Sequence, residues 1–283
     1  MDGPTILVRT LSRASRQDSY GNLWQYHPQS DYHSQIACWG LLFDLLQYSS
    51  VLGRHVVEGK VGFALRQKIG DARGGSEKKL DLVLGTPENA ADVVFGLTLA
   101  DVARDLGIDL TEGERTTLGQ LPDIRCVSVA SIRMAIEAKA CVTEHVKALP
   151  RLYAELSSSQ VAIHSSNHSV IGAALVMINV APQFRSPKLN KFLLETGTPK
   201  MTTHRQPHAA ERTVEKLRSV SLRTELTGKG YDAVGAILLD LVNDGSAVTL
   251  SQTPPAPQPA DVLHYHQFIH RLAELYATRF ENT

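Results

Sequence analysis

Apolar and polar residues alternate along residues 132–139, and a period of two is typical of a β-strand. One face of this strand is predicted to carry Ile132, Met134, Ile136 and Ala138, and the other Arg133, Ala135, Glu137 and Lys139. Glu137 and Lys139 then stand on one face, about 6.6 Å apart at two residues of strand rise. A second strand is predicted for residues 80–85, where Asp81 lies on the polar face. Its apolar face holds Leu80, Leu82 and Leu84.

Apolar residues at helical spacing predict helices around these strands. The expected helices cover residues 30–50, 99–106, 146–156, 211–226 and 265–276, and one more helix starts at Thr111. Asp31 and Thr98 are the expected N-caps of the first two, and Thr111 with Glu114 is expected to form a capping box. Further strands are expected at 56–65, 170–180 and 233–242, and loops at 71–77 and 185–208. The predicted buried faces are Val146, Leu149, Tyr153 and Leu156 in the helix after Lys139, and Tyr265, Phe268, Ile269, Leu272 and Tyr276 in the last helix.

Together these elements predict an α/β fold, in which helices flank a central mixed β-sheet and residues 1–283 form a single domain. A helical insertion is expected at 86–122, between the two strands that carry the carboxylates. The whole chain has no net charge, but residues 182–230 carry +6 and residues 71–123 carry −6. This asymmetry indicates that the basic loop and helix at 182–230 face a polyanion.

Composition restricts the class of protein. With 283 residues, 43% of them hydrophobic, the chain is long enough for one substantial core. Its three cysteines cannot pair completely and show no CxxC spacing, which favours a reducing, cytoplasmic setting. The segment 1–16 lacks the apolar stretch of a secretory signal, and the most apolar run, 170–181, is too short to cross a bilayer. We therefore expect no membrane partner.

The polar faces of the two strands indicate a chemistry. A carboxylate that holds a divalent cation, beside a lysine that orients or deprotonates a water, is what metal-dependent phosphodiester hydrolysis requires. Asp81 interrupts a run of leucine and valine, and a charge inside a strand needs a partner or a metal. The alternative to a metal is an ion pair with Lys78, Lys79 or Arg133.

The tripeptide Glu137-Ala138-Lys139 on a strand, an aspartate on an earlier strand and a helix directly afterwards resemble the restriction-endonuclease-like PD-(D/E)XK nuclease superfamily, over roughly residues 79–181. In total size and appended helices the chain also resembles a type II restriction endonuclease. The resemblance implies Mg²⁺ held by Asp81, Glu137 and the Ala138 carbonyl, with Lys139 positioning or deprotonating the attacking water. It also implies hydrolysis of DNA to 5′-phosphate and 3′-hydroxyl ends, in a restriction or defence role.

A second aspartate competes with Asp81 for the first catalytic position. Asp123 follows a proline and precedes Glu137 at the short spacing usual in the family, whereas Asp81 stands much farther back, before the expected insertion. The apolar surroundings of Asp81 favour Asp81, because Asp123 follows what reads as an exposed helix end. Asp44, inside another apolar run, is a candidate third carboxylate, although a hydrogen-bonded structural aspartate explains it more simply.

Double-stranded DNA is the expected partner. A single site of this kind cuts one strand, so a homodimer is the simplest way to cut both. The candidate phosphate contacts are Lys147, Arg151, Arg185, Lys188, Lys191, Arg212, Lys216 and Arg218.

Three other interpretations compete with a nuclease. Histidines four residues apart, with a neighbour at His264, could bind zinc: the pairs are His266 with His270 and His164 with His168. Residues 98–121 resemble a helix-turn-helix and would make the protein a DNA-binding regulator without catalysis. Carboxylates at the start of the expected recognition helix oppose that interpretation, because they repel phosphates. A non-catalytic interaction protein on the same fold is the third possibility.

Overall fold

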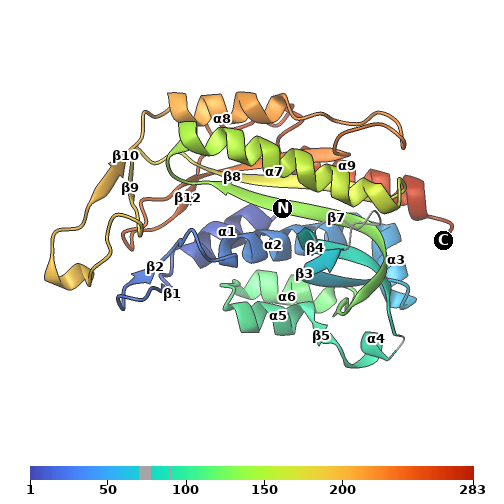
Figure 1. Cartoon of the computed structure of the whole chain (residues 1–283). Helices are drawn as coiled ribbons and strands as arrows, with labels where there is room; N and C mark the ends of the chain where they lie inside the picture. Colours follow the sequence, from blue (N-terminus) through green and yellow to red (C-terminus); the bar gives the residue numbers. More distant parts are fainter. Residues whose placement is uncertain (70–77, 90) are drawn as a thin grey trace.

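A mixed eight-stranded β-sheet forms the centre of the computed structural model, which describes residues 1–69, 78–89 and 91–283 (Figure 1). From one edge to the other the sheet runs through β12 (Thr249–Leu250), β11 (Ala233–Asp240), β8 (Ile171–Asn179), β7 (Val129–Cys141), β4 (Lys78–Pro87), β3 (Gly62–Ile69), β6 (Arg125–Cys126) and β5 (Leu97–Thr98). Strands β3, β4 and β7 are antiparallel neighbours, whereas β7, β8 and β11 are parallel. The predicted α/β fold with a central mixed sheet is confirmed. The loop expected at 71–77 lies outside the described residues.

Helices cover both faces of this sheet. One face packs against α1 (Gly3–Leu11), α2 (Tyr32–Tyr48), α3 (Ser50–Val57) and α9 (Tyr265–Phe280), and the other against α7 (His145–Ser166) and α8 (His208–Arg218). In Figure 1, α7 and α8 lie above the sheet and α1 and α2 below it. Each face has its own hydrophobic core, because alternate residues of the central strands enter opposite layers.

The insertion between β4 and β7 contains α4 (Asp92–Phe95), α5 (Leu99–Leu106) and α6 (Glu112–Gln120). Both predicted capping residues are confirmed, since Thr98 and Thr111 each form a capping box. Helix α5 ends at Gly107, whose φ of 64° is the left-handed conformation that glycine tolerates. The start of α6 is held against α1 by an ion pair between Glu114 and Arg9. The helix that a helix-turn-helix would use for groove reading is thus docked on its own protein.

Two small hairpins lie together at one end of the molecule (Figure 1). The first pairs β1 (Arg16–Gln17) with β2 (Leu23–Trp24), and the second pairs β9 (Gln183–Arg185) with β10 (Met201–Thr203). A short 3₁₀ helix, η1 (Leu194–Thr196), interrupts the segment between β9 and β10. The predicted loop at 185–208 therefore has defined structure.

The local patterns predict the buried elements well and the exposed ones less well. Every residue of β8 is buried, and so is the whole predicted stripe of α9. In α7, however, Val146 is exposed and Leu152 takes its place in the core. The predicted start of the strand at 56–65 is wrong, because Val56 lies in α3 and β3 starts at Gly62. The helix predicted at 211–226 is α8, which ends at residue 218.

Because of a β-bulge at the start of β7, two residues face the side of the sheet opposite to the predicted one. The register of β4 and β7 shifts between Leu84 and Gly85, so Arg133 is an extra residue on β7. Arg133 turns to the face covered by α3 and α9, where its guanidinium contacts His55. Ile132 packs on the α7 side instead. The predicted sides of these two residues are therefore wrong, since a bulge shifts the alternation by one position.

In the described ranges, no single helix has both the length and the apolarity to cross a bilayer. The pair α2 and α3 reaches the threshold by length and composition only, and its two helices meet at 97°.

Candidate active site between β4 and β7

Asp81 and Glu137 meet where β4 and β7 separate. The last backbone pair of the two strands is Leu82 with Ile136, so Asp81 is next to Glu137 across the sheet. Beyond this point the Asp81 side chain replaces the strand partner: the Ala138 N–H donates to Asp81 Oδ2 at 2.8 Å. The structure thus brings together the residues that the sequence assigned to the site.

The alternation predicted for the second strand fails at this same point. Leu82 and Leu84 pack in the core beneath α2, but Leu80 packs in the core beneath α7. The predicted single face for all three leucines is therefore wrong. β4 changes its orientation at Asp81, and this change lets the carboxylate turn toward the backbone of β7.

Glu137 is the most deeply buried group of the site, with 1% of its side chain exposed. Its Oε1 lies 2.7 Å from Lys139 Nζ. Its Oε2 is also buried and has no hydrogen-bond partner in the described part of the chain. A buried carboxylate oxygen without a partner is energetically costly, because it has lost water without a replacement.

The charges in this site are strongly coupled. Burial and the adjacent Glu137 carboxylate raise the pKa of Asp81 from 3.8 to about 6, although the Ala138 N–H and Lys139 oppose the rise. Burial alone would lower the pKa of Lys139, but the charges of Glu137, Asp81 and Glu155 outweigh burial and raise it. Lys139 is therefore held as a cation, and Asp81 is poised to exchange a proton near neutral pH.

Glu155 of α7 completes the environment of Lys139 on one side, and the sequence did not identify it. Its Oε2 lies 3.6 Å from Lys139 Nζ, and its Oε1 accepts from Arg151 Nε at 2.6 Å. The available signal was the spacing of Arg151 and Glu155, four residues apart on the helix after the motif. Arg151, predicted as a phosphate contact, is instead engaged with this carboxylate.

The start of α2 forms the other side of the site, which was also missed. Asp31, predicted only as an N-cap, binds Lys79 at 3.1 Å and Arg66 at 2.9 Å. The Ser34 hydroxyl donates to the Ala138 carbonyl at 3.3 Å. Burial, with a smaller contribution from the nearby Lys139, lowers the pKa of His33 to about 4, although the Asp31 carboxylate opposes this shift.

The ion pairs that would have made Asp81 a structural residue are absent from the described residues. Lys79 binds Asp31, and Lys78 Nζ donates to Ser158 Oγ at 3.4 Å. Arg133 contacts His55 on the face of the sheet that α3 and α9 cover. Asp81 therefore depends on the Ala138 N–H and on longer-range attraction to Lys139.

The competing Asp123 and the candidate third carboxylate, Asp44, both lie outside this site. Asp123 is exposed, pairs with Arg125, and precedes β6, three strands from β7 in the sheet order. That separation is about 14 Å at the usual strand spacing, too far to share a metal ion with Glu137. Asp44 is fully buried and accepts from the Asp2 and Gly3 N–H groups and from the Tyr265 hydroxyl, so it anchors the start of α1.

The donor set fits a hard divalent cation. In a strand the N–H and C=O of one residue point to the same side, so the Ala138 carbonyl faces the side on which Asp81 lies. Two carboxylates, one of them with an unpartnered buried oxygen, and this carbonyl are oxygen donors of the kind that Mg²⁺ takes. Within residues 1–69, 78–89 and 91–283 no three His, Cys, Asp or Glu side chains form a metal-holding group. Mg²⁺ does not need one, because it commonly uses one or two carboxylates with waters and substrate phosphate.

The histidine pairs have other neighbours. His266 and His270 pack against each other and against Tyr48, with ring centroids 4.4 Å apart within the pair. His164 lies 3.6 Å from Asp232 in a buried cluster.

Five of the other predicted phosphate contacts divide into two groups. Lys147 pairs with Glu144, Arg218 with Asp261, and Lys216 lies over the ring of Tyr153. These side chains belong to α7 and α8, in the outer layer above the sheet (Figure 1). Lys188 and Lys191 instead lie in the segment between β9 and β10, at the end of the molecule where the small hairpins gather (Figure 1).

Comparisons of the chain with protein-family models, with curated proteins and with solved structures gave no match.

Proposed function

We propose that this protein is a Mg²⁺-dependent DNA endonuclease of restriction type that acts in the cytoplasm in defence against foreign DNA. One observation carries the proposal: Asp81 and Glu137 come together at the point where two strands separate, with a buried Glu137 oxygen that has no partner among the described residues and a lysine that contacts only the other oxygen. This is the combination of carboxylates and cation that metal-assisted phosphodiester hydrolysis uses.

Asp81, Glu137 and the Ala138 carbonyl would hold the metal ion. When bound there, Mg²⁺ lowers the pKa of a water and offsets charge on the scissile phosphate. Lys139 is fixed by Glu137 and Glu155, and its raised pKa keeps it protonated at neutral pH. A protonated lysine orients the attacking water and stabilises the charge that develops on the phosphate oxygens. Proton removal from that water then falls to solvent or to the substrate, because Asp81 and Glu137 would be engaged with the metal ion and Lys139 is already protonated.

Two further parts of the proposal concern assembly and substrate. Each chain offers one such site, so cutting both strands of a duplex calls for two copies, and a homodimer is the simplest arrangement. Double-stranded DNA is the proposed substrate because the segment 182–230 concentrates a net charge of +6 in a chain whose total charge is zero.

The test is a cleavage assay on supercoiled plasmid, linear duplex, single-stranded DNA and RNA, each with Mg²⁺ or with EDTA. We expect duplex cleavage with Mg²⁺ only. Glu137→Gln and Lys139→Met are each expected to reduce the rate by roughly 100-fold or more, because each removes a group that acts on the reacting phosphate. The matched control is Asp123→Asn, which removes a carboxylate that lies three strands from β7.

Cleavage that persists in EDTA, or that survives Glu137→Gln in a folded variant, contradicts the proposal. DNA binding without cleavage under any metal condition would favour a regulator. Cleavage of RNA alone would retain the mechanism and change the substrate class.

A further inference from the structure

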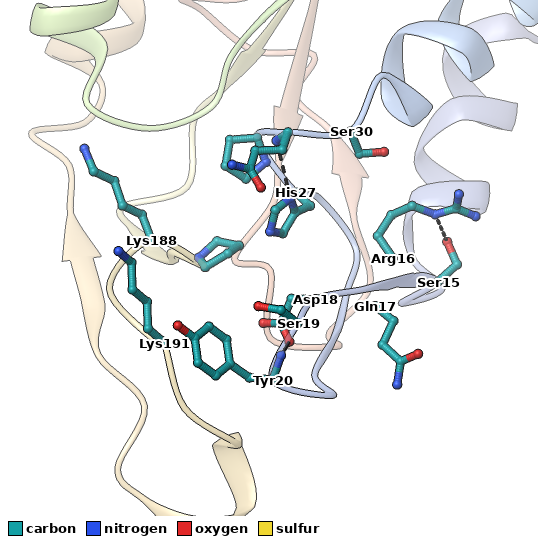
Figure 2. Close-up of a pocket in the computed structure, with 13 residues that line it drawn as sticks. Ser15, Arg16, Gln17, Asp18, Ser19, Tyr20, His27, Ser30, Lys188 and Lys191 are labelled. Atoms are coloured by element: carbon teal, nitrogen blue, oxygen red, sulfur yellow. Dashed lines mark hydrogen bonds between the residues drawn. The ribbon is translucent and has the colours of Figure 1, made fainter.

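A cavity of about 780 Å³ lies outside the candidate site, between the first hairpin and the segment that joins β9 to β10. Its walls are residues 15–20 with 27–30 on one side and residues 187, 188 and 191 on the other. Figure 2 shows Lys188 and Lys191 on one side of the cavity and Arg16 and Ser15 on the opposite side. The two walls come from distant parts of the sequence, the amino-terminal hairpin and the segment after β9.

The cavity is held open by a buried asparagine that bridges its walls. Asn22, which is 5% exposed, donates from Nδ2 to the Phe192 carbonyl and accepts at Oδ1 from the Leu194 N–H, both at 2.8 Å. Asn190, fully buried, fixes the far wall by donating to the Ser186 and Lys200 carbonyls. Amide side chains used this way organise a rigid frame, so the cavity is preorganised.

The residues that line the cavity carry a net positive charge. Among the residues that line it, all of them described, Asp18 alone is acidic. Its two oxygens are already occupied by the Tyr20 and Asn22 N–H groups, the Asn22 amide and the Trp24 indole.

The cations of the cavity have few partners among the described residues. The Arg16 guanidinium lies over the Tyr32 ring at 3.7 Å, and its Nε donates to the Ser15 hydroxyl. In the described parts of the chain Lys191 has no hydrogen-bond or ion-pair partner, and Lys188 has a single contact at 3.7 Å with Glu144, both lysine side chains being exposed.

The cavity is close to the candidate active site along the chain. Ser30 lines the cavity, and Ser34 contacts the Ala138 carbonyl of the site. Four residues span at most about 14 Å when fully extended, so Ser30 and Ser34 lie within that distance. At about 3.4 Å of rise per nucleotide in one strand, this corresponds to about four nucleotides.

We propose that this cavity binds the phosphodiester backbone of the nucleic acid a few nucleotides from the bond that is cut, with Arg16, Lys188 and Lys191 as the phosphate contacts. The inference rests on the proposed function only in taking nucleic acid as the substrate. Guanidinium and ammonium groups on two fixed walls suit a chain of phosphates, because each wall can contact a successive phosphate. The first hairpin is thereby assigned to substrate binding, which the sequence patterns did not indicate.

The test is binding of a fluorescent DNA duplex in EDTA, where no cleavage interferes, at several salt concentrations. For the double variant Arg16→Ala/Lys191→Ala we expect a loss of affinity of at least tenfold at low salt. Each lost phosphate contact also lowers the slope of log K against log salt by about 0.9, so the slope falls by about 2. The matched control is Arg54→Ala/Lys60→Ala, which removes the same charge beside the chain's carboxyl-terminal residues.

The control is expected to bind within twofold of the unmodified protein. Charge reversal in Lys191→Glu should weaken binding more than Lys191→Ala, and the thermal unfolding of each variant shows that the fold is retained. Equal affinity and slope in the double variant and the unmodified protein overturn the proposal. So does displacement of the duplex by low-millimolar inorganic phosphate at constant ionic strength, which reveals a site for the free anion.

The two proposals fail separately. Duplex binding that depends on Arg16 and Lys191, without cleavage in Mg²⁺, supports the cavity and contradicts the nuclease. Cleavage in Mg²⁺ that is unaffected by the double variant supports the nuclease and contradicts the cavity.

Discussion

Two aspartates of this protein, the buried Asp232 and the half-buried Asp81, have opposite electrostatic surroundings. Asp232 accepts from Arg223 Nε and Nη2 and from the Gly172 N–H, each at 2.8 Å, and also from Arg279. Burial alone would raise the pKa of Asp232, but the nearby His164 together with these contacts outweighs burial and lowers it. Asp81 has one N–H donor and an adjacent carboxylate, and its pKa is raised to about 6.

The difference separates a structural carboxylate from a candidate functional one. Asp232 accepts hydrogen bonds from two arginines, Arg223 and Arg279, so the positive charges around it outnumber its own negative charge. Its contacts connect β8, the end of α9 and the residues before β11. Among the described residues, Asp81 and Glu137 share one close cation, Lys139. A folded protein tolerates such a deficit of positive charge where a ligand supplies it, and pKa shifts of this kind gather at functional sites.

Substitution of Asp232 should have the largest effect. Asp232→Asn leaves Arg223 buried with its charge uncompensated, and breaking a buried ion pair in this way costs about 3–5 kcal/mol. Chemical denaturation at pH 7.5 measures the loss. A change below about 1 kcal/mol would mean that the cluster is not structural and would remove the contrast with Asp81.

Substitution of Lys139 should have the next largest effect on stability, because it leaves Glu137 without its nearest cation. Lys139→Met takes the nearest cation from the buried Glu137 carboxylate, and because Lys139 is partly exposed we expect a loss of about 2–3 kcal/mol. The double variant Glu137→Gln/Lys139→Met should recover most of this loss, because it removes the charge as well as its partner. Additive losses in the double variant would show that the two groups are not coupled.

Asp81→Asn should stabilise the protein, with a defined dependence on pH. The pKa of Asp81 rises from 3.8 to about 6 on folding, so its contribution to stability is complete below pH 3.8 and is lost as the pH rises through 6. A shift of about two pKa units corresponds to at most about 3 kcal/mol in the free energy of unfolding. Partial solvent access to Asp81 reduces this to about 1–2 kcal/mol. Relative to the unmodified protein, the variant should therefore gain stability between pH 4 and pH 7.

Asp232, whose pKa is lowered, should respond to pH in the opposite direction: its contribution is present above about pH 4 and is lost on acidification. Denaturation curves of both variants between about pH 2 and pH 8 test both pH responses, because the Asp232 contribution changes only below about pH 4. Two aspartates with the same pH response would contradict the comparison.

Asp123→Asn should have the smallest effect. This aspartate is exposed and makes a surface ion pair with Arg125, so the change in stability should stay below about 0.5 kcal/mol at every pH. A clear loss of stability or of metal affinity would indicate that Asp123 belongs to the site after all.

The sequence predicted those parts of the fold that local patterns determine. The strand at 170–180 and the stripe of the last helix were found because their side chains are buried along the whole element. The bulge at Arg133 was not predictable, because it depends on the register with β4. The two-residue strands β5 and β6 were missed because they are too short to show a period.

The candidate site was predictable only in part. The spacing usual in the family favoured Asp123, whereas the apolar run around Asp81 favoured the residue that the structure places against Ala138. Glu155 and Ser34 reach the site through the packing of α7 and α2, which no motif encodes. The cavity beside it depends on Asn22, which joins segments that are distant in the sequence.

The binding of Mg²⁺ in the absence of DNA tests the central claim most directly. At pH 6 Asp81 is about half protonated, so binding of Mg²⁺ to the carboxylates should release about half a proton per ion. Isothermal titration calorimetry at pH 6, in two buffers of different ionisation enthalpy, measures both the affinity and this proton release. We expect one site with proton release in the unmodified protein and no binding in Glu137→Gln. Equal binding by both proteins, or binding without proton release, would contradict the account.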